Sequence, residues 1–72
     1  MKYREVAKKL VKLGCLELPY KGTGSHRKWH NPNALNVVPI PVPDWGSKDL
    51  KIGTLRVIIK QLELDWEKFK NA

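Results

Sequence analysis

The sequence has a single cysteine, few acidic residues and no long apolar run. One cysteine, Cys15, excludes an intramolecular disulfide and leaves a cysteine-based zinc site without enough ligands. No apolar stretch approaches the ~18 residues that cross a bilayer, and the amino terminus lacks the apolar core of a signal peptide. We therefore expect a cytoplasmic protein with no membrane partner, in which Cys15 is a small hydrophobe within a strand.

The chain is also short, with 72 residues, of which 42% are hydrophobic and 29% are charged. This balance is typical of a folded protein rather than of a disordered tail. At this length only about 60% of the surface of the unfolded chain can be buried. We expect one domain over residues 1–72, with a site that is shallow or shared with a partner.

Positive charge is the most marked feature of the composition. Fourteen Lys and Arg residues face seven Asp and Glu residues, which gives a net charge of +7. Such a balance favours a polyanionic partner: RNA, DNA, an anionic membrane surface or an acidic protein. The charge alone does not select among these partners.

The first third of the chain predicts a helix followed by a strand. Apolar residues recur at helical spacing over residues 3–13, with basic residues on the other side, and Gly14 follows the last of them. A left-handed glycine commonly ends a helix, so we expect the helix to stop there. Leu16, Leu18 and Tyr20 then alternate with other residues as in a half-buried strand and share one face.

Two more extended segments follow. Residues 21–25 predict a glycine-containing loop between strands, residues 26–30 predict a second strand, and residues 31–33 predict a turn. Residues 36–43 are rich in β-branched side chains and carry prolines at every second position near their end. These prolines place the missing N–H donors on one side, so this strand should lie at the edge of a sheet.

Helical spacing returns near the carboxyl terminus, over residues 54–64. Gly53 or Thr54 can stand at the start of this helix, and we prefer Gly53 because it lies nearer the preceding loop. Asp65 can cap a last short helix over residues 66–69.

Together these elements predict an α+β fold of order α-β-β-β-α with a short C-terminal helix. Three successive strands with short connections predict a three-stranded antiparallel sheet. Two helices on one face of that sheet leave the other face open to solvent.

Most side chains that could take part in catalysis or ligand binding lie between Lys21 and His30. If strand alternation holds, His26, Lys28 and His30 share one face, while Arg27 and Trp29 share the other. Trp29 is the natural core residue, so the histidine face should be solvated. Histidine side chains ordinarily exchange protons near pH 7, and nearby cations can hold an anion, which suits cleavage of RNA by its own 2′-hydroxyl.

Plainer interpretations of the same residues stand beside this one. A histidine on a basic strand is more often a solvated surface residue than a catalyst. His26 and His30 are four strand residues apart, roughly 13 Å, too far to serve one phosphate or to bind one metal ion. His30 is therefore expected to bind or to support the fold, and no metal is expected.

The remaining features are less specific. The glycine loop leads into a strand and not a helix, so it is no P-loop. Of the three tryptophans, only Trp45 is expected at the surface. The basic side of the first helix is most simply a solvated face, with contact to phosphates or to an acidic partner as the alternative. That side is formed by Lys2, Arg4, Lys8, Lys9 and Lys12.

An ordered set of short motifs resembles the HicA toxins, also called YcfA-like proteins. The motifs are Leu13-Gly14-Cys15, Lys21-Gly22, Gly24-Ser25-His26, Trp29 before His30-Asn31-Pro32, Val38-Pro39, Leu50-Lys51-Ile52-Gly53-Thr54-Leu55-Arg56 and Ile59-Lys60-Gln61. The likeness runs over most of the chain. It departs from the family pattern in two places. Thr23-Gly24 interrupts the usual Lys-Gly-Ser-His, and Trp45 stands near the position in the loop before the second helix where the family often carries a further histidine.

The resemblance implies a fold like that of the double-stranded-RNA-binding domain and a metal-independent ribonuclease that cuts mRNA without a cofactor. It makes His26 the catalytic residue, with Lys21, Arg27 and Lys28 as phosphate contacts and Ser25 as an orienter of the imidazole. A HicB-like antitoxin is the implied protein partner. Two other hypotheses stay open: a non-catalytic RNA-binding module and a protein-interaction domain with an acidic partner.

Overall fold

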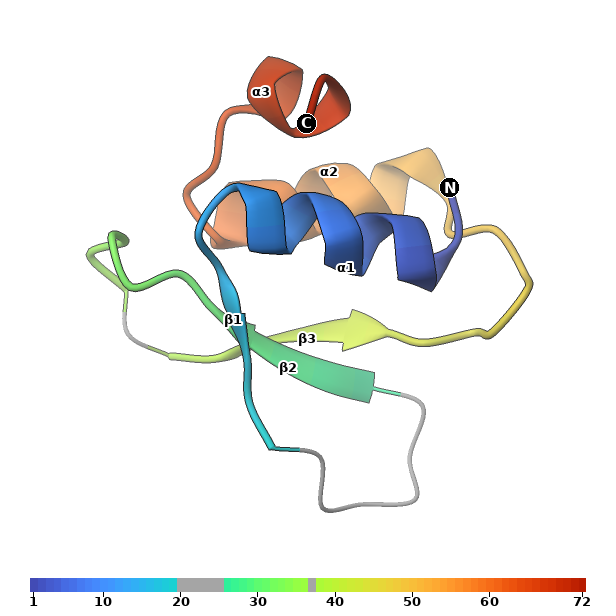
Figure 1. Cartoon of the computed structure of the whole chain (residues 1–72), viewed down its shortest axis with the longest axis horizontal. Helices are drawn as coiled ribbons and strands as arrows, with labels where there is room; N and C mark the ends of the chain where they lie inside the picture. Colours follow the sequence, from blue (N-terminus) through green and yellow to red (C-terminus); the bar gives the residue numbers. More distant parts are fainter. Residues whose placement is uncertain (20–25, 37) are drawn as a thin grey trace.

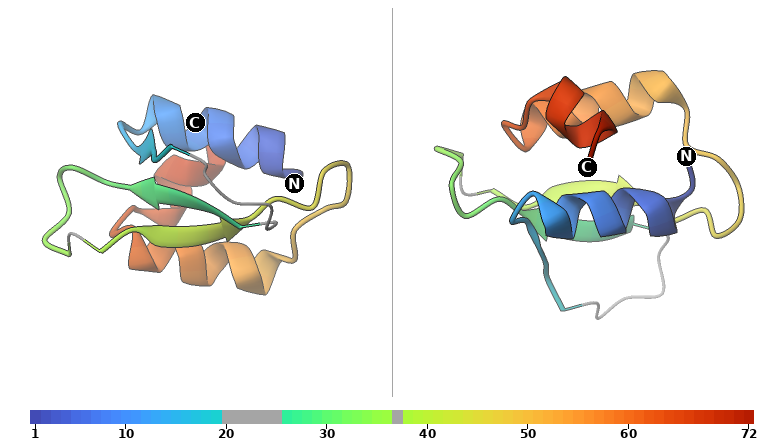
Figure 2. Two further views of the ribbon diagram at one scale, coloured as in Figure 1. Left: turned by 90° about the horizontal axis from the view of Figure 1, so that it is seen from below. Right: turned by 45° about the horizontal axis from the view of Figure 1, so that its top comes forward.

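The three strands form one antiparallel sheet, and two helices cover the same side of it (Figures 1 and 2). A computed structural model of the chain describes residues 1–19, 26–36 and 38–72. Its elements are α1 (Tyr3–Lys12), β1 (Leu16–Glu17), β2 (His26–His30), β3 (Ile40–Pro43), α2 (Ile52–Gln61) and α3 (Trp66–Lys70). The sheet order is β1-β2-β3. The predicted α-β-β-β-α arrangement and α+β class are confirmed.

Helix α1 follows the apolar spacing of the sequence. Tyr3, Val6 and Leu10 are buried, and Gly14 takes the left-handed conformation at φ +89° that ends the helix. Cys15 is buried as predicted, but it precedes β1 instead of lying within it. Its N–H still donates to the Leu10 carbonyl oxygen at 2.9 Å, which is part of closing the helix end. Burial raises the pKa of the Cys15 thiol.

Strand β1 is shorter than expected, and its faces are reversed. It ends at Glu17, although the Leu18 N–H still donates to the Lys28 carbonyl oxygen at 2.9 Å. Glu17 pairs with Trp29, which is buried under the helices, and Leu16 is 57% exposed. The apolar face predicted for this strand therefore lies on the open side of the sheet, and the glutamate turns toward the helices. Tyr20 lies outside the described residues.

Strand β3 is an edge strand as predicted, but it begins at Ile40 rather than at residue 36. The segment before it is held by a carboxylate. Glu63 accepts hydrogen bonds from the N–H groups of Leu35, at 3.1 Å, and Asn36, at 2.9 Å. These backbone donors bond to a side chain instead of to a neighbouring strand. Val37 lies outside the described residues.

Helix α2 begins and ends earlier than expected. Lys51 is its N-cap residue and Gly53 lies in its first turn, so neither Gly53 nor Thr54 starts it. The helix stops at Gln61 because Glu63 adopts a left-handed φ of 57°. Asn31 fixes the same end, since its Nδ2 group donates to the Leu62 carbonyl oxygen at 2.7 Å. Contacts that are remote in sequence thus decide the end of α2.

Helix α3 packs over α1 and α2 on the side away from the sheet (Figure 1). Asp65 caps it as predicted, accepting a hydrogen bond from the Lys68 N–H at 3.0 Å. Phe69 is fully buried, and the Arg56 guanidinium lies 4.7 Å from the centre of the Trp66 ring. The core contains Tyr3, Val6, Leu10, Cys15, Trp29, Ile40, Val42, Leu50, Leu55, Ile58, Ile59, Leu62 and Phe69.

In the part of the chain that the structure describes, no helix is long and apolar enough to span a lipid bilayer.

Candidate nucleic-acid interface

Strand β2 divides its side chains between the two faces of the sheet. Trp29 is only 1% exposed and lies against the helices. Arg27 is on the same side, since it bonds to Glu17, which also contacts α1. By alternation His26, Lys28 and His30 lie on the opposite, open side, where His26 and Lys28 are exposed and His30 is half-buried. The alternation predicted for this strand is therefore present.

A chain of polar contacts holds β2 from the helix side. The Trp29 Nε1–H donates to the Tyr3 hydroxyl oxygen at 3.1 Å, and the Tyr3 O–H donates to Glu17 Oε1 at 2.9 Å. Arg27 Nη1 donates to Glu17 Oε2 at 3.1 Å, and Arg27 Nε lies 3.6 Å from Asp44 Oδ2. Desolvation raises the pKa of Tyr3 to about 12. We call these residues, Tyr3, Glu17, Arg27, Trp29 and Asp44, the polar chain.

Sequence reasoning missed the polar chain. The only local signal for it is Glu17, an acidic residue between two leucines of a short strand. Because the chain ties α1, β1, β2 and the segment after β3 together, it fixes the side to which each β2 residue points. It also balances the charge of Arg27 with two carboxylates, on the opposite side of the sheet from His26.

The open side of the sheet has a different chemistry. His30 is paired with Leu16, Lys28 with Pro41 and His26 with Pro43. Among the described residues of the open side, made up of Leu16, Leu18, His26, Lys28, His30, Pro41 and Pro43, there is no carboxylate. A basic surface without acidic neighbours attracts phosphate groups.

Not every residue predicted for the site falls within the described ranges. Lys21 and Ser25 are outside the described residues, so their predicted roles stay predictions. Within the described ranges no group of three or more His, Cys, Asp or Glu side chains could hold a metal ion. Trp45, predicted at the surface, is 40% exposed, in a loop where Asp44 Oδ1 accepts a hydrogen bond from the Gly46 N–H at 3.1 Å.

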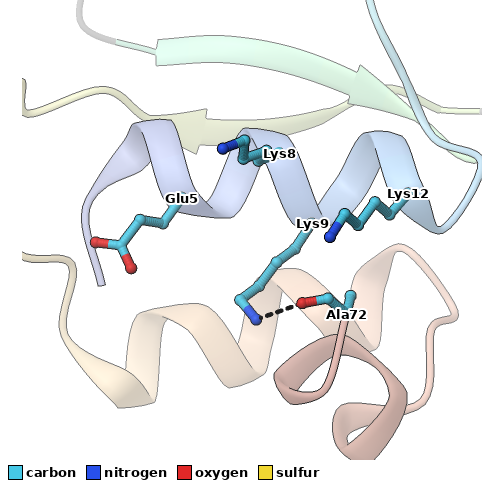
Figure 3. A pocket seen from close by; sticks show the side chains of 5 residues that line it. All are labelled: Glu5, Lys8, Lys9, Lys12 and Ala72. Atoms are coloured by element: carbon cyan, nitrogen blue, oxygen red, sulfur yellow. Dashed lines mark hydrogen bonds between the residues drawn. The ribbon is translucent and has the colours of Figure 1, made fainter.

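The basic side of α1 is not uniformly solvated (Figure 3). Lys8 and Lys12 are exposed, but Lys9 reaches across to the last turn of α3. Its Nζ donates to the main-chain oxygens of Lys70, at 2.8 Å, and Ala72, at 2.9 Å. Carbonyl oxygens at the end of a helix attract cations, so Lys9 links α1 to the end of α3 instead of facing solvent.

Two comparisons with known proteins bear on this surface. A family model described as HicA toxin of bacterial toxin-antitoxin matches residues 3–64 of the chain. The match includes α1, all three strands and α2, and with them the open side of the sheet and the polar chain. A comparison with curated protein sequences gives no significant match.

Proposed function

The chain belongs to the HicA toxin family of bacterial toxin–antitoxin systems, and from this premise we propose that it is a metal-independent endoribonuclease that cleaves mRNA. The family gives the chain a toxin's role and an antitoxin as partner. One observation supports the nuclease most strongly: His26 is exposed beside Lys28 on a surface whose described residues include no carboxylate. A proton acceptor and a phosphate-binding cation are the two groups that cleavage of RNA by its 2′-hydroxyl needs.

The proposed reaction uses the RNA's own nucleophile. The His26 imidazole accepts the proton of the 2′-hydroxyl, and O2′ attacks the adjacent phosphorus. The bond from phosphorus to O5′ breaks, and O5′ takes up a proton from the imidazolium or from water. The products are a 2′,3′-cyclic phosphate and a 5′-hydroxyl, with no metal ion or cofactor in any step.

The other residues are given supporting roles. Lys28 contacts the phosphate on the same face as His26, and His30 contacts a neighbouring part of the RNA. Lys21 is proposed as a second phosphate contact and Ser25 as the orienter of the imidazole. Arg27 is the weaker phosphate contact in this proposal, because it would have to exchange Glu17 and Asp44 for the RNA.

We propose that the antitoxin is HicB-like and that it covers the open side of the sheet. Leu16 is 57% exposed there, and Leu18 is half-buried beside it. Apolar residues next to a basic site provide a protein partner with a surface to bury that RNA phosphates do not use.

A second candidate function is a non-catalytic RNA-binding module. Within the described residues no group forms a hydrogen bond with the His26 imidazole, whereas a general base is usually oriented by a partner. The same basic surface would bind phosphates without any chemistry.

The deciding experiment incubates purified, antitoxin-free protein with a single-stranded mRNA, with and without EDTA. We expect cleavage that resists EDTA, leaves 2′,3′-cyclic phosphate ends and falls by about 10²- to 10⁴-fold in His26→Ala. His30→Ala removes the same side chain on the same strand and is expected to keep most of the activity. Undiminished cleavage by His26→Ala would sink the histidine mechanism, and binding without cleavage by the unmodified protein would favour the second candidate.

A further inference from the structure

A hollow of about 330 Å³ lies beside His26, between the edge of the sheet and α2. Helix α2 runs along β3, as the view from below in Figure 2 shows. His26, Pro41 and Pro43 line the hollow from the sheet, and Thr54, Val57, Ile58 and Gln61 line it from the helix. We call it the α2 hollow.

Three of the side chains that line the α2 hollow from the helix are not part of the buried core. Thr54, Val57 and Gln61 are three and four residues apart, so they form one stripe along α2. This stripe lies beside the buried one, and Val57 is 55% exposed. In the described part of the chain, the side chains of Thr54 and Gln61 take part in no hydrogen bond. An apolar group between two unused polar groups suits a ligand with an apolar face and polar edges.

Charge separates this hollow from two others. A hollow of about 390 Å³ near the start of α1 is lined by Asp44 together with Lys2 and Arg4. One of about 170 Å³ between α1 and the chain end is lined by Glu5 together with three lysines. The described residues that line the α2 hollow include no carboxylate. A segment of RNA that enters the α2 hollow therefore meets no carboxylate that would repel its phosphate groups.

The register of the sheet connects the α2 hollow to the proposed site. Pro43 is paired with His26 and Pro41 with Lys28. The two proline rings thus lie opposite the two side chains proposed to act on the phosphate. A nucleotide whose phosphate lies between His26 and Lys28 has its base within reach of the hollow.

We infer that the α2 hollow binds one nucleobase of single-stranded RNA, next to the phosphodiester at His26. The inference rests on the proposed function for the position of the cut. The exposed Pro41 ring and the Val57 methyl groups contact the flat face of the base, as apolar and aromatic side chains do in other base-binding sites. The Gln61 amide supplies a donor and an acceptor for the base edge, and the Thr54 hydroxyl supplies one of either kind.

This site makes the protein selective for unpaired RNA. A base within a duplex is stacked and paired, so it cannot enter a hollow between a strand and a helix without being extruded. Gln61 and Thr54 also give the enzyme a preference among bases at one position of the substrate.

The binding test uses an oligonucleotide that cannot be cut. A four-nucleotide single strand with 2′-O-methyl groups lacks the attacking hydroxyl, so it reports binding alone. We expect it to shift the NMR signals of the Val57 and Thr54 methyl groups and the Gln61 side-chain amide. An abasic residue at one of the four positions should remove these shifts and weaken binding by about tenfold.

The cleavage test uses a randomised RNA pool and sequencing of the ends. Gln61→Ala should reduce the base preference at one position next to the cut by about five- to tenfold. Asn71→Ala truncates an exposed amide at the end of α3, on the side of the helices away from the sheet, and is expected to leave the preference unchanged.

The outcomes separate the inference from the proposed function. If the protein shifts the α2 hollow signals on binding but never cuts, the nuclease proposal fails and the base site stands. If it cuts RNA but the hollow signals stay in place and Gln61→Ala keeps the base preference, the base site fails. Hollow signals that move only on addition of the antitoxin would assign the hollow to a protein side chain and also overturn the inference.

Discussion

The two sides of strand β2 differ in how far their polar groups are satisfied. On the helix side, Trp29 and Arg27 both bond within the polar chain. On the open side, His26 and Lys28 are exposed, and no carboxylate accompanies them among the described residues of that face. Alternation along one five-residue strand thus separates side chains that hold the fold from side chains that are available to a ligand.

The basic residues of this protein therefore do not all serve the same purpose. A net charge of +7 suggests a basic surface everywhere. The cation on the helix side of β2 is balanced by Glu17 and Asp44, and Lys9 is bound to main-chain oxygens of the last helical turn. The number of basic residues in the sequence therefore overstates the number that can contact RNA.

The largest difference between the two sides of β2 is expected in stability, when one side chain is removed from each side. Trp29→Ala is expected to lower the free energy of unfolding by about 3–5 kcal/mol, because it leaves a cavity and removes the N–H that donates to the Tyr3 hydroxyl oxygen. His30→Ala should change it by less than about 0.5 kcal/mol. Urea unfolding followed by circular dichroism measures both.

If Trp29→Ala does not fold, Trp29→Phe provides the same comparison. It keeps most of the ring but loses the N–H bond to Tyr3, so a loss of about 1–2 kcal/mol is expected. Equal losses for a helix-side and an open-side variant would contradict the division of β2.

Strand β1 offers a second comparison, in which the charged residue should matter more than the apolar one. Glu17→Ala is expected to cost about 1–2 kcal/mol, because it removes the acceptor of both Tyr3 and Arg27. Leu16→Ser, at a position 57% exposed, should cost less than about 0.5 kcal/mol. A larger loss for Leu16→Ser would mean that the sequence pattern, and not the observed register, describes the faces of β1.

The polar chain also predicts a loss of stability in alkali. Burial raises the pKa of Tyr3 from 10.0 to about 12, so its contribution is complete below pH 10 and is lost as the pH rises toward 12. The unfolding free energy should fall by about 1 kcal/mol more between about pH 8 and pH 11 in the unmodified protein than in Tyr3→Phe. Parallel curves for the two proteins would show that Tyr3 titrates as a solvated phenol.

The smallest expected effect concerns the salt dependence of RNA binding by the two cations of β2. With an uncleavable single strand, Lys28→Ala should make the slope of log affinity against log salt shallower by about 0.7, the value for one phosphate contact. Arg27→Ala should change the slope less, because Glu17 and Asp44 already neutralise the guanidinium. An equal change in both variants would place Arg27 among the phosphate contacts.

Local signals in the sequence were sufficient for much of the fold. Gly14 marks the end of α1, Asp65 caps α3, and the prolines of β3 place it at an edge. Each of these effects acts within a few residues of its cause. The same holds for the alternation of His26, Lys28 and Trp29.

The sequence-based predictions were wrong where contacts between residues remote in sequence decide the bounds or the faces of an element. Glu63 takes the N–H groups that would have extended β3, and its left-handed backbone ends α2 early. Glu17 turns toward the helices because it accepts hydrogen bonds from Tyr3, 14 residues before it, and from Arg27, 10 residues after it. The α2 hollow has no sequence signal at all, because it forms between a strand edge and a helix that are joined by a loop.

Local patterns in the sequence are thus enough to set the order of the elements, the core stripe of each helix, the basic charge and the alternation that exposes His26. Periodicity and capping depend on covalent spacing, which the chain carries whatever it packs against. Tertiary contacts are needed to set which face of β1 turns toward the helices, which cations are already neutralised, and the position of His26 beside the α2 hollow. Those features depend on side chains that are distant in sequence and meet only once the sheet and helices have packed together.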